Sequence, residues 1–254
     1  MTSPDLALAL ELADLADGIT MPRYRAADLR VTRKPDLTPV SEADEAVEQA
    51  IRARLGEARP DHAVVGEEYG QDGDADAEWR WIVDPIDGTK NYVRGMPVWA
   101  TLIALQRGGE VVLGVVSAPA LGRRWWAERG GGAFADGAPM HVSQVEGLGD
   151  AYVSFAGYGT FRTGGRGDQL DELLRRSWRV RALGDFWQHM LVAEGAVDVA
   201  IDPEVSLWDL AALQVIVEEA GGRFTTFAGE ARPDGGSGIS TNGRVHDEVL
   251  AIFA

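Results

Sequence analysis

The chain has 254 residues, and its 24 Lys and Arg against 40 Asp and Glu give a formal net charge of −16. This acidity argues against a nucleic-acid-binding protein, because such affinity comes largely from Lys and Arg contacts to phosphates. The chain has no cysteine, which excludes disulfides, thiolate zinc sites, iron–sulfur clusters and a cysteine nucleophile. No apolar run reaches the roughly 18–20 residues of a membrane span, and residues 1–9 do not resemble a secretion signal, so we expect a cytoplasmic protein.

The N-terminal part of the sequence predicts two helices followed by a largely antiparallel sheet. Ser3 is expected to cap the first helix, which should end or kink at 18–21, and the proline-containing, charged segment 32–40 is typical of a loop. Ser41 is expected to cap the second helix, which closes at 56–61. Short apolar runs and glycine turns then predict buried strands at 63–65 and 81–83 and two hairpins, 98–105 with 110–116 and 124–128 with 133–134.

The C-terminal part alternates strands and helices, which is typical of layered α/β proteins. A seam near 147–150 divides the chain into an α+β half, 1–147, and an α/β half, 148–254, which we expect to form one compact catalytic unit. The predicted strands are 151–155, 178–182, 197–201, 224–227 and 238–240, and the predicted helices are 168–176, 185–194, 209–220 and 246–253.

Acidic residues follow the predicted apolar strands and begin one of the predicted helices. Glu67 and Glu68 come after one strand, Asp84 and Asp87 come after the next, and Asp209 lies at a helix start. Such positions can direct carboxylates into a common crevice, where like charges raise one another's pKa unless a cation is bound. Oxygen ligands without His or Cys suit Mg²⁺, Mn²⁺ or Ca²⁺.

Several of these acids also have a structural interpretation. Asp44 lies three residues after Ser41 and can complete a capping box. Glu67 and Glu68 can form a solvated turn, and Asp209 can be a helix N-cap. The segment 84–89 is different, because a structural turn does not require two acids, a glycine and a threonine after a buried strand. A helix beginning at its glycine would also direct free N–H groups at a phosphate.

Three motifs, 66–68, 84–89 and 208–212, resemble those of the metal-dependent inositol monophosphatase superfamily, in the same order and spacing. The segment 34–44 and the glycine pair 221–222 are similar to further motifs of that superfamily, so the resemblance spans nearly the whole chain. It implies a layered αβαβα sandwich of the inositol monophosphatase and fructose-1,6-bisphosphatase type. It also implies hydrolysis of small-molecule phosphate monoesters with two or three Mg²⁺ ions, and a homodimer without nucleic-acid or membrane partners.

The resemblance also implies roles for individual residues. Gly88 and Thr89 resemble the residues whose amides hold the phosphate, and Glu68 and Thr89 resemble those around the attacking water. Glu67 together with Thr89 can orient that water and accept its proton. The residues that resemble metal ligands are Glu67, Asp84, the carbonyl of Ile86, Asp87 and Asp209, with Asp44 as a more remote acid that supports a weaker metal.

The segment 184–189 departs from the small residues that inositol phosphatases carry there. The segments 91–101, 193–198 and 203–206 instead resemble bacterial histidinol-phosphate phosphatases of the superfamily. Histidinol phosphate carries an ammonium group and an imidazole ring, which Asp185 and Glu204 can pair with. Phe186 or Trp187 can stack on that ring.

Other interpretations of these substrate residues remain open at the level of sequence. The two aromatic residues can belong to the core, and Asp185 can be a helix N-cap. Arg94 can contact the phosphate or be a surface cation. The four histidines are scattered through the sequence, and we interpret them as structural or surface residues.

The sequence thus predicts a Mg²⁺-dependent histidinol-phosphatase of histidine biosynthesis. The alternatives are an inositol-1-monophosphatase, a phosphatase of nucleotide 3′-phosphates, for which we see no base pocket, and a regulatory binding protein of the same fold. A regulatory protein without activity should have lost a ligand, whereas the full set of acids and Thr89 is present here.

Overall fold

The computed structural model describes residues 2–35, 37–74 and 76–253; Asp36 of the N-terminal motif lies outside them. Its largest element is an eight-stranded sheet in which all neighbours are antiparallel except β3 and β5. The strand order is β10-β9-β8-β7-β6-β5-β3-β4, formed by β3 (Ala63–Gly66), β4 (Gly70–Asp72), β5 (Trp79–Asp87), β6 (Ala100–Arg107), β7 (Glu110–Ala118), β8 (Arg123–Glu128), β9 (Gly132–Ala135) and β10 (Ala138–Pro139).

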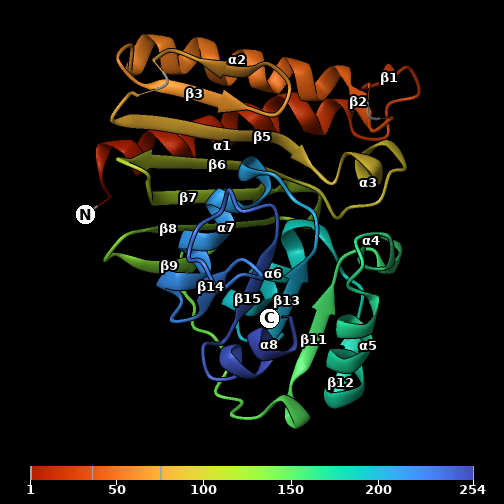
Figure 1. Ribbon diagram of the computed structural model, residues 1–254. Helices are drawn as coiled ribbons and strands as arrows, with labels where there is room; N and C mark the ends of the chain where they lie inside the picture. The colour runs from red at the N-terminus through yellow and green to blue at the C-terminus, as the bar shows by residue number, and fades with distance from the viewer. Residues whose placement is uncertain (1, 36, 75, 254) are drawn as a thin grey trace.

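Two helices, α1 (Pro4–Arg23) and α2 (Glu42–Ala58), cover one face of this sheet (Figure 1). Ser3 and Ser41 cap them as expected. The predicted end of α1 at 18–21 is wrong, because the buried face of the helix continues through Ala16 and Thr20 and outweighs the low helix propensity of the exposed Gly18.

The segment 32–40, predicted as a loop, is partly a hairpin. Strands β1 (Val31–Arg33) and β2 (Pro39–Ser41) pair antiparallel, so the loop is confined to the turn between them. Pro39 begins β2, a position where the missing N–H of proline is tolerated. The remaining elements predicted after Ser41 are all present.

A second, five-stranded sheet and two further helix layers complete the fold (Figure 1). Helices α6 (Asp185–Ala193) and α7 (Leu207–Glu219) lie between the two sheets, and α5 (Gly167–Arg176) and α8 (His246–Phe253) pack together on the outer side. This is the predicted αβαβα sandwich. The second sheet has the order β12-β11-β13-β15-β14, formed by β11 (Tyr152–Phe155), β12 (Arg179–Arg181), β13 (Val199–Asp202), β14 (Arg223–Thr225) and β15 (Gly238–Thr241).

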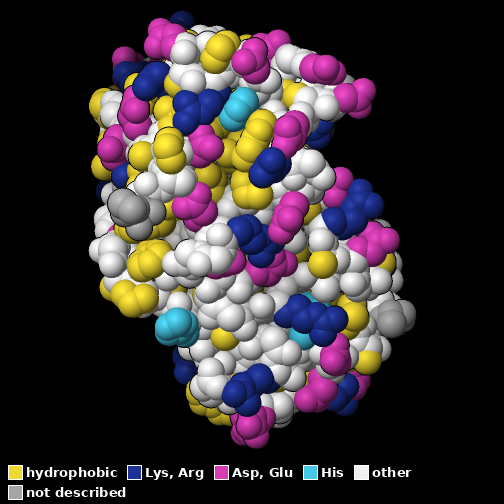
Figure 2. Space-filling model, turned by 90° about the vertical axis from the view of Figure 1, so that its left-hand side faces the viewer, with side chains coloured by type: hydrophobic (Ala, Val, Ile, Leu, Met, Phe, Trp, Pro, Cys, Tyr) yellow, Lys and Arg dark blue, Asp and Glu magenta, His cyan; other side chains and the backbone are white. Residues whose placement is uncertain are grey.

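Helix α4 (Tyr158–Thr163) and strands β4 and β10 were not predicted, whereas the short helix α3 (Thr89–Val93) follows Gly88, where the motif suggested a helix. None of the described helices combines the length and the apolar character needed to cross a membrane. On the face shown in Figure 2, basic and acidic side chains of the described residues are interspersed and form no broad basic area.

Helix α7 lies directly on β7, and Gly114 permits this close approach. A Cβ atom at Gly114 would lie 2.6 Å from the carbonyl oxygen of Ala212 and 2.9 Å from its Cα atom. Both contacts are with helix backbone, which cannot move without displacing α7. Because α7 carries Asp209 in its first turn, this packing also sets the height of that carboxylate above the sheet.

We predict that Gly114→Ala lowers the free energy of unfolding by about 1–3 kcal/mol, the usual cost of overpacking a core. Urea unfolding followed by circular dichroism measures the change. Gly56→Ala is a matched control, because Gly56 is an exposed residue of α2 with nothing within 4 Å of an added Cβ. Equal stability of the two variants would show that α7 can move away from β7 at little cost.

Candidate active site

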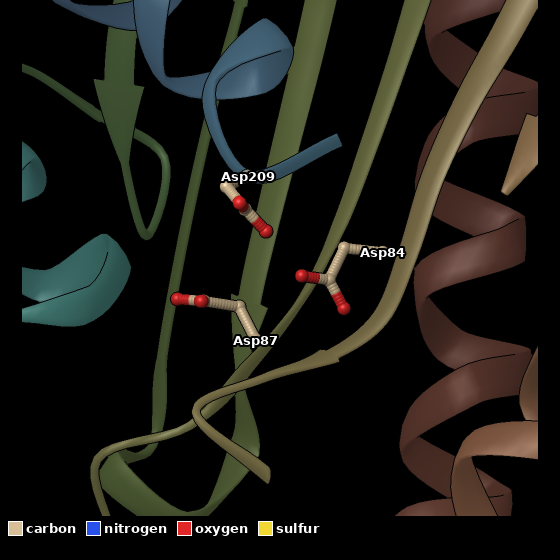
Figure 3. Close-up of side chains that lie close together, drawn as sticks. All are labelled: Asp84, Asp87 and Asp209. Atoms are coloured by element: carbon tan, nitrogen blue, oxygen red, sulfur yellow. The ribbon is translucent and has the colours of Figure 1, made fainter. Parts of the chain in front are cut away.

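Three aspartates, two from strand β5 and one from helix α7, converge where these two elements meet. Oxygens of Asp84, Asp87 and Asp209 all lie within 4.8 Å of one another. Figure 3 shows the three side chains close together, with those of Asp84 and Asp209 turned toward each other. In a regular strand, Asp84 and Asp87 would point to opposite faces, because their separation is odd. The pairing of β5 with β6 is irregular between these two residues, and this bulge brings both carboxylates to the same side.

Backbone contacts hold this bulge in shape. The amide of Ile86 donates to Oδ1 of Asp84 at 3.0 Å, and the hydroxyl of Thr101 donates to the carbonyl of Pro85 at 2.8 Å. The carbonyl of Ile86 lies 2.9 Å from the hydroxyl of Thr89. The segment 84–89 is therefore a fixed loop that presents two carboxylates and a hydroxyl.

Two of the acids serve as capping residues as well as facing the site. Asp44 completes a capping box with Ser41, and its Oδ1 atom lies 3.1 Å from the hydroxyl of Thr89. Asp209 completes a second capping box, in which its Oδ2 atom accepts the amide of Ser206 at 2.6 Å. The N-cap of α7 is thus Ser206, and each acid uses its Oδ2 atom for capping, while Oδ1 of Asp44 accepts from Thr89.

The turn that carries Glu67 and Glu68 is held by a buried acid rather than being solvated. Glu48 of α2 accepts the amides of Glu68 at 2.7 Å and Tyr69 at 3.1 Å. It also pairs with Arg52, which compensates its charge. A Cβ atom at Gly66 would lie 2.1 Å from Glu48, so glycine is required for the turn to approach this carboxylate.

The assembled carboxylates are electrostatically unfavourable without a cation. Desolvation and the charge of Glu67 raise the pKa of Asp84 well above its usual value, and desolvation and the charge of Asp185 do the same for Asp87. Desolvation raises the pKa of Asp209 to about 7. Lys34 compensates the outer part of the cluster, with Nζ 2.6 Å from Glu67 and 2.8 Å from Glu68.

Two adjoining cavities of about 340 and 260 Å³ open beside the cluster. Both are lined by Asp185, Glu204 and Asp209, and both are also lined by Lys90. The larger one reaches Glu67, Gly88 and Thr89, and the smaller one reaches Asp87 and Asp202. Gly88 has φ of 81°, and a Cβ there would lie 2.9 Å from the carbonyl of Val98. The cavities therefore connect the acidic cluster with the predicted substrate residues Asp185 and Glu204.

Three of the interpretations of substrate residues need correction. Arg94 is exposed at the end of α3 and lines neither cavity. Phe186 is only 1% exposed and its ring packs near Trp125, so it is a core residue at the wall of the smaller cavity rather than an exposed stacking surface. Asp185 is not an N-cap: Gly184 holds that position, and Asp185 follows it with φ of 49°.

Two residues with charged side chains, Lys90 and Asp202, line the cavities and were not predicted as site residues. Lys90 follows Thr89 directly, and Asp202 ends strand β13. The rule that selected Asp84, an acid at the end of an apolar strand, also applies to Asp202 and would have found it.

The comparison with known proteins agrees with this geometry. A model of the inositol monophosphatase family matches residues 2–253. The chain is 56% identical to a histidinol-phosphatase of Mycobacterium tuberculosis and 53% identical to one of Streptomyces coelicolor, each over 98% of this chain and 98% or 96% of the relative. An IMPase structure from Thermotoga maritima superposes with a TM-score of 0.89 at 33% identity, covering 99% of this chain and 97% of that one.

We predict that the metal-free protein loses stability as the pH rises from about 4 to about 7. The pKa of Asp209 is about 7 in the folded chain against an ordinary value of 3.8, so the folded state binds the proton more tightly. The stabilisation by protonated Asp209 is complete at a pH below the pKa of this residue in the unfolded chain. It is lost as the pH rises through the pKa of the residue in the folded chain. Urea unfolding with a chelator present at pH 5, 6, 7 and 8 measures it.

Asp209→Asn should weaken this pH dependence, because the amide keeps an oxygen for Ser206 but does not titrate, whereas Asp84 and Asp87 still do. Saturating Mg²⁺ should flatten it in the wild type as well. Stability of the chelated wild type that increases over the same interval would contradict the prediction.

Proposed function

The chain belongs to the inositol monophosphatase family and is a phosphatase, and we propose that it hydrolyses L-histidinol phosphate to L-histidinol and phosphate with the help of Mg²⁺. The observation that carries the choice of substrate is the 56% identity to a histidinol-phosphatase over nearly both whole chains. We place this reaction in histidine biosynthesis, in the cytoplasm, with the protein as a homodimer.

The charges around the smaller cavity support this substrate. Asp185, Asp202 and Glu204 line this cavity, which Glu67 and Thr89 do not line. An alcohol that carries an ammonium group gains from carboxylates there, whereas a neutral polyol does not require them. The strained backbone at Asp185 is held by Asn91, whose amide group donates to Oδ2 of Asp185 at 2.8 Å. That carboxylate therefore has a fixed position before the substrate binds.

The donor set fits Mg²⁺. Asp84, Asp87, Asp209, Glu67 and the carbonyl of Ile86 offer only oxygen atoms, which are the ligands Mg²⁺ prefers. Desolvation and then the neighbouring carboxylates raise the pKa values of Asp84 and Asp87, which a bound cation would offset. Asp44, linked to the site through Thr89, is proposed to support a weaker ion. When bound, two or three ions would neutralise the phosphate, lower the pKa of a water molecule and stabilise the leaving oxygen.

The protein groups around Thr89 would orient the attacking water. The hydroxyl of Thr89 lies 2.9 Å from the carbonyl of Ile86 and 3.1 Å from Asp44, so its orientation is fixed. We propose that Thr89 and Glu67 hold the water, that Glu67 accepts its proton, and that Glu68 maintains Lys34 beside it. The water oxygen bonds to phosphorus, the bond from phosphorus to the alcohol oxygen breaks, and the alcohol oxygen takes up a proton.

The amides at the start of α3 are proposed to bind the phosphate. Gly88 precedes this helix, and Thr89 is its first residue. Both residues line the larger cavity together with Glu67 and Asp209. Lys90 lines the same cavity and adds a positive charge for the phosphate, a role for which Arg94 is not placed because it lines neither cavity.

Inositol-1-monophosphatase activity is the second candidate, favoured by the fold shared with the Thermotoga maritima IMPase. A phosphate-release assay separates the two. It compares L-histidinol phosphate, inositol 1-phosphate, fructose 1,6-bisphosphate and 3′-phosphoadenosine 5′-phosphate, each with Mg²⁺ and with excess chelator. We expect the highest kcat/KM for L-histidinol phosphate and no turnover in chelator. A preference for inositol 1-phosphate would transfer the assignment to the second candidate.

We predict that Asp87→Asn removes most of the activity while the fold persists. The amide keeps an oxygen for the backbone N–H of Phe186 but loses the charge that binds the cation. Metal catalysis supplies several kcal/mol, so kcat/KM should fall by about a hundredfold or more in saturating Mg²⁺. Asp150→Asn, at an exposed position outside both cavities, is the control. Near-wild-type turnover of Asp87→Asn would remove this residue from the site.

We predict that Asp185→Asn weakens turnover of L-histidinol phosphate selectively. Asparagine tolerates the positive φ at this position, so the backbone should not change. A hydrogen bond to a charged group contributes roughly 1.5–3 kcal/mol, so kcat/KM should fall about tenfold or more. Glycerol 2-phosphate, whose alcohol is neutral, should be affected less. Equal losses on both esters would identify Asp185 as a scaffold residue.

A further inference from the structure

Two histidines of the described chain are completely buried, and the proposed mechanism uses neither. His246 lies between the hydroxyls of Thr225 and Thr241, away from both cavities. His189 lies on α6 and lines the smaller cavity. Its Nε2 atom is 2.6 Å from Oδ2 of Asp202, and its Nδ1 atom is 2.7 Å from the hydroxyl of Ser240. The ring therefore has a contact at each nitrogen and a fixed orientation.

The carboxylate of Asp202 is held by one oxygen only. Its Oδ2 atom accepts from Nε2 of His189 and also from the amide of Gln188 at 2.7 Å. Within the part of the chain that the structure describes, Oδ1 of Asp202 has no hydrogen-bond donor. Since Asp202 lines the cavity together with Asp87 and Asp185, Oδ1 is the atom left to meet a ligand.

Neighbouring groups make this arrangement rigid. The hydroxyl of Ser154 donates to Oε1 of Gln188 at 2.9 Å, so the carboxamide cannot turn away from Asp202. At the start of the same helix, the amide of Phe186 donates to Oδ2 of Asp87 at 2.6 Å. Helix α6 thus fixes two carboxylates that line the smaller cavity, Asp87 of the acidic cluster and Asp202 of β13.

We propose that His189 is a positioning residue that aims Asp202 at the cationic end of the substrate and so sets the preference for an amino-alcohol phosphate over a neutral one. The inference rests on the proposed function. Without the N–H donor at Nε2 of His189, only the amide of Gln188 still holds Oδ2 of Asp202. The carboxylate can then rotate, and its Oδ1 atom no longer points in one direction. A cation in the cavity would then be bound more weakly, while the hydrolytic groups around Thr89 stay in place.

The test compares His189→Phe, which removes the donor, with His189→Gln, which can return an N–H near Nε2. His246→Phe is the matched control, because His246 is equally buried but faces no cavity. Steady-state kinetics with Mg²⁺ use L-histidinol phosphate and glycerol 2-phosphate. We expect His189→Phe to raise KM for L-histidinol phosphate about tenfold, with a smaller effect on kcat and on the neutral ester. His189→Gln should recover most of the loss, and His246→Phe should affect both esters alike.

A second measurement uses the wild-type protein and needs no variant that folds poorly. With four histidines in the chain, ¹⁵N-labelled imidazole resonances can be assigned to His189 by the His189→Gln variant. Added L-histidinol should shift the ring resonance of His189 and not that of His246, whereas added glycerol should shift neither. Absence of a shift at His189, or equal kinetic losses on both esters, would overturn the positioning role. A wild type without activity on L-histidinol phosphate would instead refute the proposed function, and the inference with it.

Discussion

The electrostatic repulsion among the three clustered aspartates is the constraint on which the site depends. Asp84, Asp87 and Asp209 bring oxygens within 4.8 Å of one another in surroundings that disfavour charge. A flexible chain would relieve this by turning the side chains apart. Here the bulge in β5, the capping box of α7 and the amide of Phe186 each hold one of these carboxylates. The protein thus keeps a cation site assembled at the expense of its own stability.

The acids around the cluster are also held in place by hydrogen bonds from other parts of the chain. Glu48 fixes the turn of Glu67 and Glu68 through two backbone amides, and Asn91 fixes Asp185 across the cavity. Most of these contacts come from elements distant in sequence, so the packing of the layers decides the geometry. The close packing of α7 on Gly114 and of Gly66 on Glu48 helps to set this geometry.

The sequence predicted the layers and the acidic residues well, because strand-end acids, capping serines and alternating apolar segments are local patterns. It failed where the outcome depends on tertiary contacts. The hairpin within 32–40 forms because β1 and β2 pair, which the proline content of the segment concealed. The direction of Arg94 depends on α3, a helix of five residues that has no periodicity to detect.

The two aromatic residues of α6 show a different limit of sequence reasoning. An amphipathic helix beside a cavity presents apolar residues to the core and polar residues to the ligand, and composition alone does not say which face each aromatic occupies. Phe186 proved to be a core residue. Asp202 was not predicted, although it ends strand β13 in the same way that Asp84 follows an apolar run of β5.

The capping boxes formed by Asp44 and Asp209 affect how related sequences should be read. Each acid helps to start a helix whether or not a cation is ever bound. In a descendant that had ceased to be an enzyme, selection for folding would still retain acids at these two positions. Asp84 and Asp87 cap no helix, and their mutual repulsion would favour replacement once catalysis no longer mattered. The presence of that pair is therefore the better sequence marker of a working enzyme in this fold.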